Sequence, residues 1–334
     1  MARSSRLRVT GYALCRTTFG MTRYLIRRLG FLGLTLLLTS LLVFGITQLL
    51  PGDVARVILG REASEAALQA LRAELGLDQP LPVQYLSWLG GFITGDWGTS
   101  YSTGLPIRPL LLERLGNSLM LGGLTLLFAV PLSVLLGVIA ALKQDKTADN
   151  VISIASLSVV GLPEFVTGLV LIQVLALRLG LFPANSSIRP GASFAEALPY
   201  LVLPALTATL VLLAYITRLT RAGVIEELKQ GYVRTATLKG LPRRQVIGRH
   251  VLRNALLPTI TVVAISFGWL ISGLIVIENV FNYPGLGRLM TFAIDRRDLP
   301  LMQAITMVTV LGFALANLAA DLLYAWLNPR IRLQ

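Results

Sequence analysis

Six long runs of apolar residues dominate this chain of 334 residues. A helix needs about 20 mostly apolar residues to cross the hydrocarbon layer of a membrane, which is about 30 Å thick. Only the third run contains a charged residue, Glu164. We therefore predict an all-α membrane protein with about six transmembrane helices, at about 31–50, 118–142, 151–177, 201–217, 255–277 and 299–320.

The composition agrees with a membrane protein. The chain is 54% hydrophobic and only 14% charged, and its mean hydropathy is +0.70. A soluble globular domain carries about 25% charged residues. The first apolar run is too long for a cleaved signal peptide and lacks a small-residue cleavage site after it, so we expect it to remain as a span.

Lysine and arginine predict the orientation of the spans. With both termini inside, the cytoplasmic segments 1–28, 143–150, 218–254 and 328–334 hold 20 of the 30 Lys and Arg. The external segments 51–116, 178–198 and 281–300 hold the other 10. Because positive loops stay inside, we expect the N-in, C-in topology. Topology and contact with membrane lipid also account for the net charge of +13, so we expect no nucleic-acid partner.

Few residues are available for bond chemistry. The chain has one cysteine, Cys15, and one histidine, His250, so we expect no metal site built from these residues. It has no Gly-Lys pair and therefore no phosphate-binding loop of the Walker type. We predict no catalytic, cofactor-binding or metal-binding residues, and we expect a transport subunit that is not an enzyme.

The chain divides into a short extension and a membrane body. Residues 1–20 are polar and basic, and Met21 is a plausible start, so we expect 1–20 to be a cytoplasmic extension, either disordered or a short surface helix. Residues 21–334 form the body. Its external segment 51–116 is predicted to contain helices near 63–75 and 83–93 and to pack against the mouth of a pore.

Prolines and one carboxylate stand out inside the spans. Pro131, Pro163 and Pro204 each remove a backbone hydrogen bond and are predicted to kink their helices. Glu164 follows Pro163 directly. A charge within a span is costly and usually faces a cavity or a partner, so we expect both residues at a pore or a subunit interface. There Glu164 could meet the amino terminus of a peptide; the alternative is a water-accessible position near the cytoplasmic end.

The cytoplasmic segment 218–254 is predicted to form two short helices that meet at a corner. The first covers 232–239, Gly240 is suited to end it in a left-handed conformation, and Pro242 suits the first turn of the second. Tyr232, Thr235, Ala236 and Lys239 recur at helical spacing and form one face with a small centre. Such a face suits close contact with a partner protein, although a solvated basic loop is an equal alternative from the residues alone.

This segment resembles the EAA loop of importer permeases of the ATP-binding-cassette (ABC) class. Ala236, Gly240 and Leu252 match the general pattern, whereas Arg234 and Arg253 replace its glutamate and proline. These departures are similar to the DppB/OppB-type permeases of peptide and nickel transport. That likeness extends over stretches 23–28, 49–53, 75–85, 95–98, 232–241, 249–258, 278–289, 321–324 and 328–332. Glu164 departs from it, because the related permeases usually carry a hydroxyl residue there.

The resemblance implies a type I ABC importer permease in the bacterial inner membrane. It implies a second, homologous permease subunit as heterodimer partner, two cytoplasmic ATP-binding subunits that hydrolyse the ATP, and an external solute-binding protein. Loop 218–254 would couple the spans to an ATPase subunit, with Ala236 and Gly240 needed for the fit. The remaining coupling residues would be Tyr232, Arg234, Thr235, Lys239, Arg243 and Arg244.

Several functions remain open at this point. The resemblance favours import of di- or oligopeptides, but the same machine transports nickel, glutathione, murein peptides or opines in related permeases. A secondary transporter would show internal repeats and intramembrane charge pairs, and neither is evident. An intramembrane enzyme is disfavoured because the spans carry one carboxylate and no histidine or cysteine.

Overall fold

The computed structural model describes residues 4–49, 54–60, 62–74, 76–189, 191 and 193–327, and no β-strand occurs within these ranges. The stretches 50–53 and 328–332, which carry part of the resemblance, lie outside the described residues. In chain order the elements are α1 (Ser4–Leu49), α2 (Val54–Leu59), α3 (Glu65–Glu74), α4 (Leu81–Thr94), α5 (Ile107–Leu142), α6 (Thr147–Val160), α7 (Glu164–Leu171), the π-helical η1 (Ile172–Arg178), α8 (Phe194–Leu228), α9 (Gly231–Leu238), α10 (Arg243–Gln245), the π-helical η2 (Val246–Val251), α11 (Leu252–Gly273), α12 (Ile275–Val280), α13 (Leu286–Asp295) and α14 (Leu299–Leu327).

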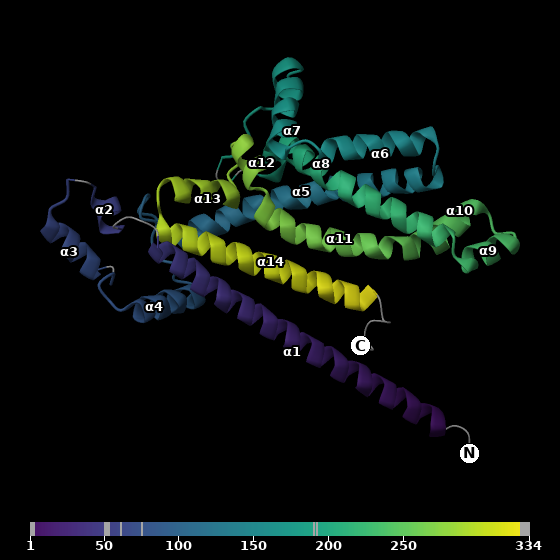
Figure 1. Ribbon diagram of the computed structural model, residues 1–334, viewed down its shortest axis with the longest axis horizontal. Helices are drawn as coiled ribbons and strands as arrows, with labels where there is room; N and C mark the ends of the chain where they lie inside the picture. Colours follow the sequence, from purple (N-terminus) through teal and green to yellow (C-terminus); the bar gives the residue numbers. More distant parts are fainter. Residues whose placement is uncertain are drawn as a thin grey trace.

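The predicted membrane class is confirmed. Five helical stretches are long and apolar enough to cross a membrane: Ile26–Leu49, Ile107–Leu142, Phe194–Leu228, Arg243–Leu270 and Leu299–Leu322. A bent pair, α6 followed by α7 and η1, makes a sixth if it counts as one span. The start of α1 and the end of α14 point toward the end of the bundle that carries α9 and α10 (Figure 1).

The third predicted span is not one straight helix. The chain bends by 103° between Thr147–Val160 and Glu164–Arg178. Pro163 stands just before α7, with an extended backbone at φ −56° and ψ 139°, so it starts a new helix and does not kink a continuous one. Pro131 and Pro204, in contrast, lie inside α5 and α8 as predicted.

Helix ends differ from the predicted spans because charged turns extend beyond the uncharged runs. α5 begins 11 residues before 118, and Glu113 and Arg114 lie in this added part. α8 continues beyond 217 through Arg218 and Arg221. Because α1 is one helix from Ser4, no helix end marks the division expected near residue 20.

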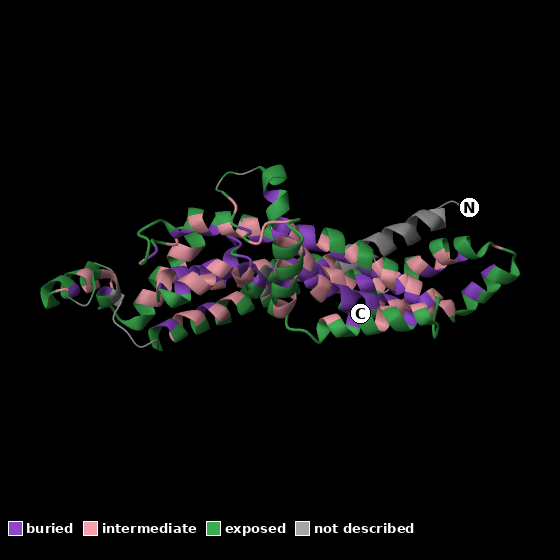
Figure 2. Ribbon diagram, turned by 90° about the horizontal axis from the view of Figure 1, so that it is seen from above, coloured by how far each residue is buried: buried purple, intermediate pink, exposed green. Residues whose placement is uncertain are grey.

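The core of the bundle is α8, packed between α5 and α11. Together with α14 these helices run side by side, and buried residues concentrate along them (Figures 1 and 2). Two hydroxyls of α8 donate to carbonyls of α5: Thr209 to Thr125 at 3.4 Å and Thr217 to Ser133 at 3.3 Å. Small and hydroxyl residues allow such close helix contacts in membranes. At Gly137, an added Cβ would lie 2.8 Å from the Thr217 carbonyl oxygen.

The segment that carries α2, α3 and α4 forms the end of the molecule opposite α9 and α10 (Figure 1). Both predicted helices are present, as α3 and α4. The segment is attached to the bundle by Asp298, at the start of α14. The buried Asp298 carboxylate accepts hydrogen bonds from the hydroxyls of Ser100 at 2.5 Å and Ser102 at 2.8 Å.

An ion pair joins the first and last spans. Arg28 of α1 lies 2.7 Å from Asp321 of α14, and both side chains are partly exposed. Sequence analysis singled out no partner for Asp321. The pair lies where basic residues precede the first apolar run. It fixes how far α1 and α14, which are distant in sequence, are shifted along each other.

Candidate functional site

The predicted corner between two helices is present, and we call residues 231–251 the elbow. Helix α9 ends at Leu238, and Gly240 follows with φ +76°. The Leu241 N–H donates to the Ala236 carbonyl at 3.3 Å, and the Gly240 N–H donates to the Thr237 carbonyl at 3.0 Å. These two bonds form a Schellman cap, which requires a left-handed residue at the position of Gly240. The predicted capping role of Gly240 is confirmed.

The second helix of the elbow continues directly into a span. Pro242 lies immediately before α10, and its carbonyl accepts from Gln245 N–H at 2.8 Å and Val246 N–H at 3.1 Å. Pro242 therefore caps the helix from the position just before its first turn. The prediction that it would lie within the first turn is wrong. From there α10, η2 and α11 follow without a loop, so the elbow is continuous with the candidate span Arg243–Leu270.

The inner side of the elbow packs against the bundle. Val233 and Ala236 are buried in one cluster with Val224 of α8, Val251 of η2 and Ala255 of α11. Ala236 is only 8% exposed. Its expected position on a face open to a partner is therefore wrong, because the small side chain allows α9 to lie close to its own chain.

The outer side of the elbow carries the remaining predicted residues. Its exposed side chains are Tyr232, Arg234, Thr235, Lys239, Arg243 and Arg244. Leu238, which is 80% exposed at the tip of the elbow, was not among the predicted residues. Leu238 lies on the side of α9 opposite Val233 and Ala236, and helical spacing could have shown this. An exposed aliphatic side chain can serve as an anchor when a partner supplies a pocket for it.

Tyr232 ties the elbow to the two helices that flank it. Its hydroxyl donates to the carboxylate of Glu227 in α8 and accepts from the Asn254 amide of α11 at 3.3 Å. Burial, followed by the hydrogen bond to Glu227, raises the pKa of Tyr232, so the hydroxyl keeps its proton. Tyr232 was predicted as a contact residue, and the structure gives it a bracing role within the chain.

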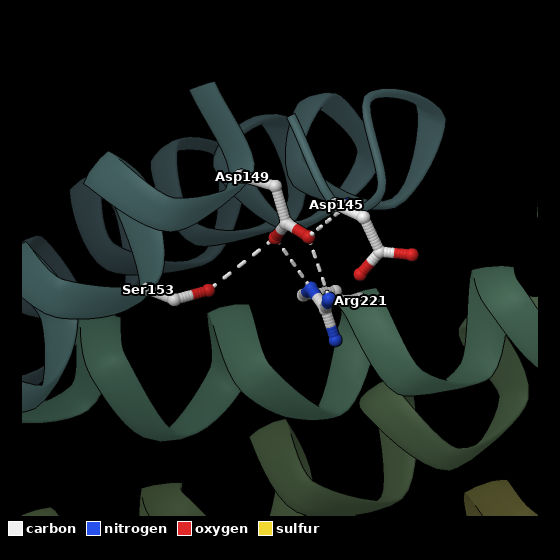
Figure 3. A network of polar contacts seen from close by, with 4 residues as sticks. All are labelled: Asp145, Asp149, Ser153 and Arg221. Carbon is white, nitrogen blue, oxygen red and sulfur yellow. Dashed lines mark hydrogen bonds and ion pairs between the residues drawn. The ribbon is translucent and has the colours of Figure 1, made fainter. Parts of the chain in front are cut away.

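A largely buried ion pair joins α6 to α8 and was not predicted (Figure 3). Arg221 of α8 donates to both carboxylate oxygens of Asp149 in α6, each at 2.6 Å. The Asp145 N–H and the Ser153 hydroxyl also donate to Asp149, at 3.0 and 3.3 Å. The Asp149 side chain is 3% exposed. This bidentate pair ties the start of α6 to α8.

Glu164 and Pro163 lie away from the elbow, at the break between α6 and α7 (Figure 1). Glu164 is half-buried in the first turn of α7, where a negative charge is favourable. It lines a cavity of about 380 Å³ together with Tyr215 and Arg218 of α8. The structure therefore forms two separate sites, the elbow and this cavity.

A third polar cluster joins α12 to α5 and α13. Glu278 of α12 is 1% exposed. Its carboxylate accepts from the Ser118 hydroxyl at 2.6 Å and from the N–H groups of Gly287 at 2.7 Å and Arg288 at 3.1 Å. It thus caps the start of α13 and links it to α5. Burial raises the pKa of Glu278 to about 7, despite these three donors.

The described residues contain no group of three or more His, Cys, Asp and Glu side chains placed to hold a metal ion. The polar clusters instead join one helix to another. They hold α5, α6, α8, α12 and α13 in fixed positions and leave the exposed side of the elbow and the cavity at Glu164 open.

Comparisons with known proteins agree with this arrangement. The family described as binding-protein-dependent transport system inner membrane component matches residues 133–333, and the corresponding N-terminal family matches residues 21–112. The glutathione transport system permease protein GsiC of Escherichia coli K12 is 37% identical over 312 residues, covering 93% of this chain and 99% of the relative.

Two further comparisons concern a second relative and a solved structure. The GsiC protein of Pectobacterium atrosepticum is also 37% identical, over 93% of this chain and 99% of its own length. A solved amino acid ABC transporter, crystallised with histidines, is 17% identical with a TM-score of 0.48, covering 66% of this chain and 94% of its own. From the family matches and these relatives, the chain belongs to the binding-protein-dependent transport system inner membrane components and is a multi-pass ABC importer permease of the DppB/OppB type.

Proposed function

We propose that this permease forms half of the translocation pathway of an ATP-driven importer for short peptides, and that its elbow receives the motion of an ATPase subunit. Permeases of this family work in membrane complexes with other permease and ATPase subunits and a binding protein. The observation that carries the coupling role is the two-sided elbow. Its inner side packs on α8 and α11, while its outer side exposes Leu238 and several cations.

The direction of coupling follows from the same geometry. An ATPase subunit that holds the outer side of the elbow would move α9, and the Val233–Ala236 side would carry that motion into α8 and α11. The pair Arg221–Asp149 would then move α6 with α8. Interfaces of this kind shift as rigid bodies between discrete arrangements. We propose the N-in, C-in orientation, which puts this basic elbow in the cytoplasm.

The partners follow from the same proposal. A second, non-identical permease would complete the pathway, two ATP-binding subunits would contact the two elbows, and an external binding protein would deliver the cargo. The external segment with α2, α3 and α4 lies at the end opposite the elbow, as such a delivery route requires (Figure 1).

Short peptides are the proposed cargo, and glutathione, a tripeptide, is the first candidate. Support comes from the relatives named as glutathione permeases, which match 93% of this chain. Nickel, murein peptides and opines are the alternatives. ATP dependence separates all of these from a secondary transporter.

The proposal is tested by uptake in cells that lack this permease and regain it from a plasmid. We expect restored uptake of radiolabelled glutathione or alanylalanine. Unlabelled substrate and vanadate should each abolish this uptake, whereas an uncoupler alone should not. Restored nickel uptake without peptide uptake would overturn the peptide proposal. Uptake that persists with vanadate and collapses with the uncoupler would overturn the ATP-driven mechanism.

A further inference from the structure

The cavity at Glu164 brings together two opposite charges, one on α7 and one on α8. It lies at the break between α6 and α7, against α8, and apolar residues such as Leu157, Val160 and Leu162 form most of its wall. Its polar groups are the Glu164 carboxylate, the Arg218 guanidinium and the Tyr215 hydroxyl. Its volume of about 380 Å³ falls within the range of small-ligand sites.

The position of Arg218 and Tyr215 on α8 is unusual. α8 is the most buried of the five long spans, because 61% of its most apolar 18-residue stretch is buried inside the protein. Every residue from 201 to 220 is described, and only Tyr215 and Arg218 in this stretch are exposed. Arg218 lies ten residues before the end of α8, which is about 15 Å of helix. The exposed residues of α8 between 201 and 220 are therefore both polar.

Neither charge is satisfied within the chain. Among the described residues, no hydrogen bond or ion pair involves the side chain of Glu164 or Arg218, and none joins the two. The contrast with Arg221 is direct, because that residue lies one turn further along α8 and is fully engaged by Asp149. A charge without a partner in a mostly apolar wall is costly, and such a group normally faces a partner molecule or a substrate path.

We propose that the cavity is a transient binding site for zwitterionic peptides during translocation. The peptide amino group would lie against Glu164, its carboxylate against Arg218, and its backbone near Tyr215. This inference rests on the proposed peptide import and adds the substrate class that the membrane subunit itself recognises: peptides with a free amino group and a free carboxylate.

The test uses the complete importer in proteoliposomes, with its binding protein and labelled alanylalanine and glutathione as probes. Glu164→Gln and Arg218→Gln should each lower uptake per ATP hydrolysed by about tenfold, as expected for a lost charge-assisted hydrogen bond. The double variant should be lower than either single variant, because each charge holds a different end of the peptide. Glu74→Gln, an exposed carboxylate of α3, is the matched control and should retain wild-type uptake.

Conservative variants separate binding from folding. Glu164→Asp and Arg218→Lys keep the charges and should retain at least about a third of the uptake, whereas a packing role would be lost in both. Unchanged uptake in the Gln variants would overturn the inference. So would a double variant no worse than the single ones, because the two charges would then serve each other.

Glu164 and Arg218 would serve a different role if they bound the second permease. In that case the Gln variants would lose that subunit on purification, and such a loss would overturn the inference. Absence of ATP-driven uptake of either probe by the wild-type complex would instead overturn the proposed function.

Discussion

Arg221 holds both carboxylate oxygens of Asp149 at 2.6 Å, and this pair joins α8 to the start of α6 across 72 residues of sequence. α8 also carries the elbow at its end and the exposed Arg218 one turn before Arg221. One helix therefore connects the elbow, the ion pair and the cavity.

Asp149→Asn should destabilise the protein, because it leaves the Arg221 charge without its partner in a mostly buried position. We expect the melting temperature of the purified complex to fall by roughly 5 °C or more. Glu65→Gln is the control, since it breaks the exposed Arg56–Glu65 pair, whose side chains are 51% and 68% exposed. That change should have little effect. Equal shifts in both variants would contradict the structural role of the Asp149–Arg221 pair.

Leu238→Ser should weaken binding of the ATPase subunits while the permease remains folded. Leu238 is 80% exposed, so its loss should change the free energy of unfolding by less than about 0.5 kcal/mol. If the ATPase subunit buries this side chain, its loss should lower the affinity by about tenfold, measured by fluorescence titration of detergent-solubilised permease with ATPase subunits. Leu59→Ser, at the external end, should bind normally. An unchanged affinity of the Leu238→Ser variant would remove this residue from the interface.

Glu278 should make stability depend on pH. Its pKa is about 7 in the folded chain against 4.5 ordinarily, so the folded state binds the proton more tightly. The stabilising contribution is complete below pH 4.5 and is lost as the pH rises toward 7, by about 3 kcal/mol in total. Between pH 5 and pH 8, the melting temperature of the wild type should fall relative to that of Glu278→Gln. A constant difference between the two proteins would contradict the raised pKa.

Gly285→Ala should disrupt the cap of α13. An added Cβ at Gly285 would lie 2.1 Å from a Glu278 carboxylate oxygen, so either the carboxylate or the backbone must shift. We expect a loss of roughly 2 kcal/mol in the free energy of unfolding, seen as a lower melting temperature. Gly116→Ala is the matched control inside α5, where no atom lies within 4 Å of the added Cβ. A Gly285→Ala variant as stable as this control would show that the cluster tolerates displacement.

Much of the fold could be predicted because the hydrocarbon layer imposes a simple rule on helices. Uncharged runs identified the five long spans, and Gly240 marked the end of α9 through its need for a left-handed backbone. The third span was misjudged, since apolar composition cannot show that α6 and α7 meet at 103°. Pro163 indicated the place of the bend but not its size.

The sites were less predictable because their partners are distant in sequence. Asp149 and Arg221 lie in different predicted segments, as do Glu278 and Ser118, and no local pattern links them. Ala236 was assigned to the outer face because its neighbours Tyr232 and Lys239 share its spacing. The burial of Val233 shows that the true inner face is rotated by about one residue.

Coupling through the elbow is tested most directly by measuring peptide uptake and ATP hydrolysis in the same proteoliposomes for Gly240→Val and Gly231→Val. Both glycines have open space around an added Cβ, but only Gly240 has a positive φ, +76°. A β-branched residue there should cost about 1–3 kcal/mol and displace the elbow. We predict that Gly240→Val lowers uptake per ATP by roughly tenfold or more, with normal membrane levels, while Gly231→Val stays near wild type. Wild-type uptake per ATP in the Gly240→Val complex would contradict the coupling role of the elbow.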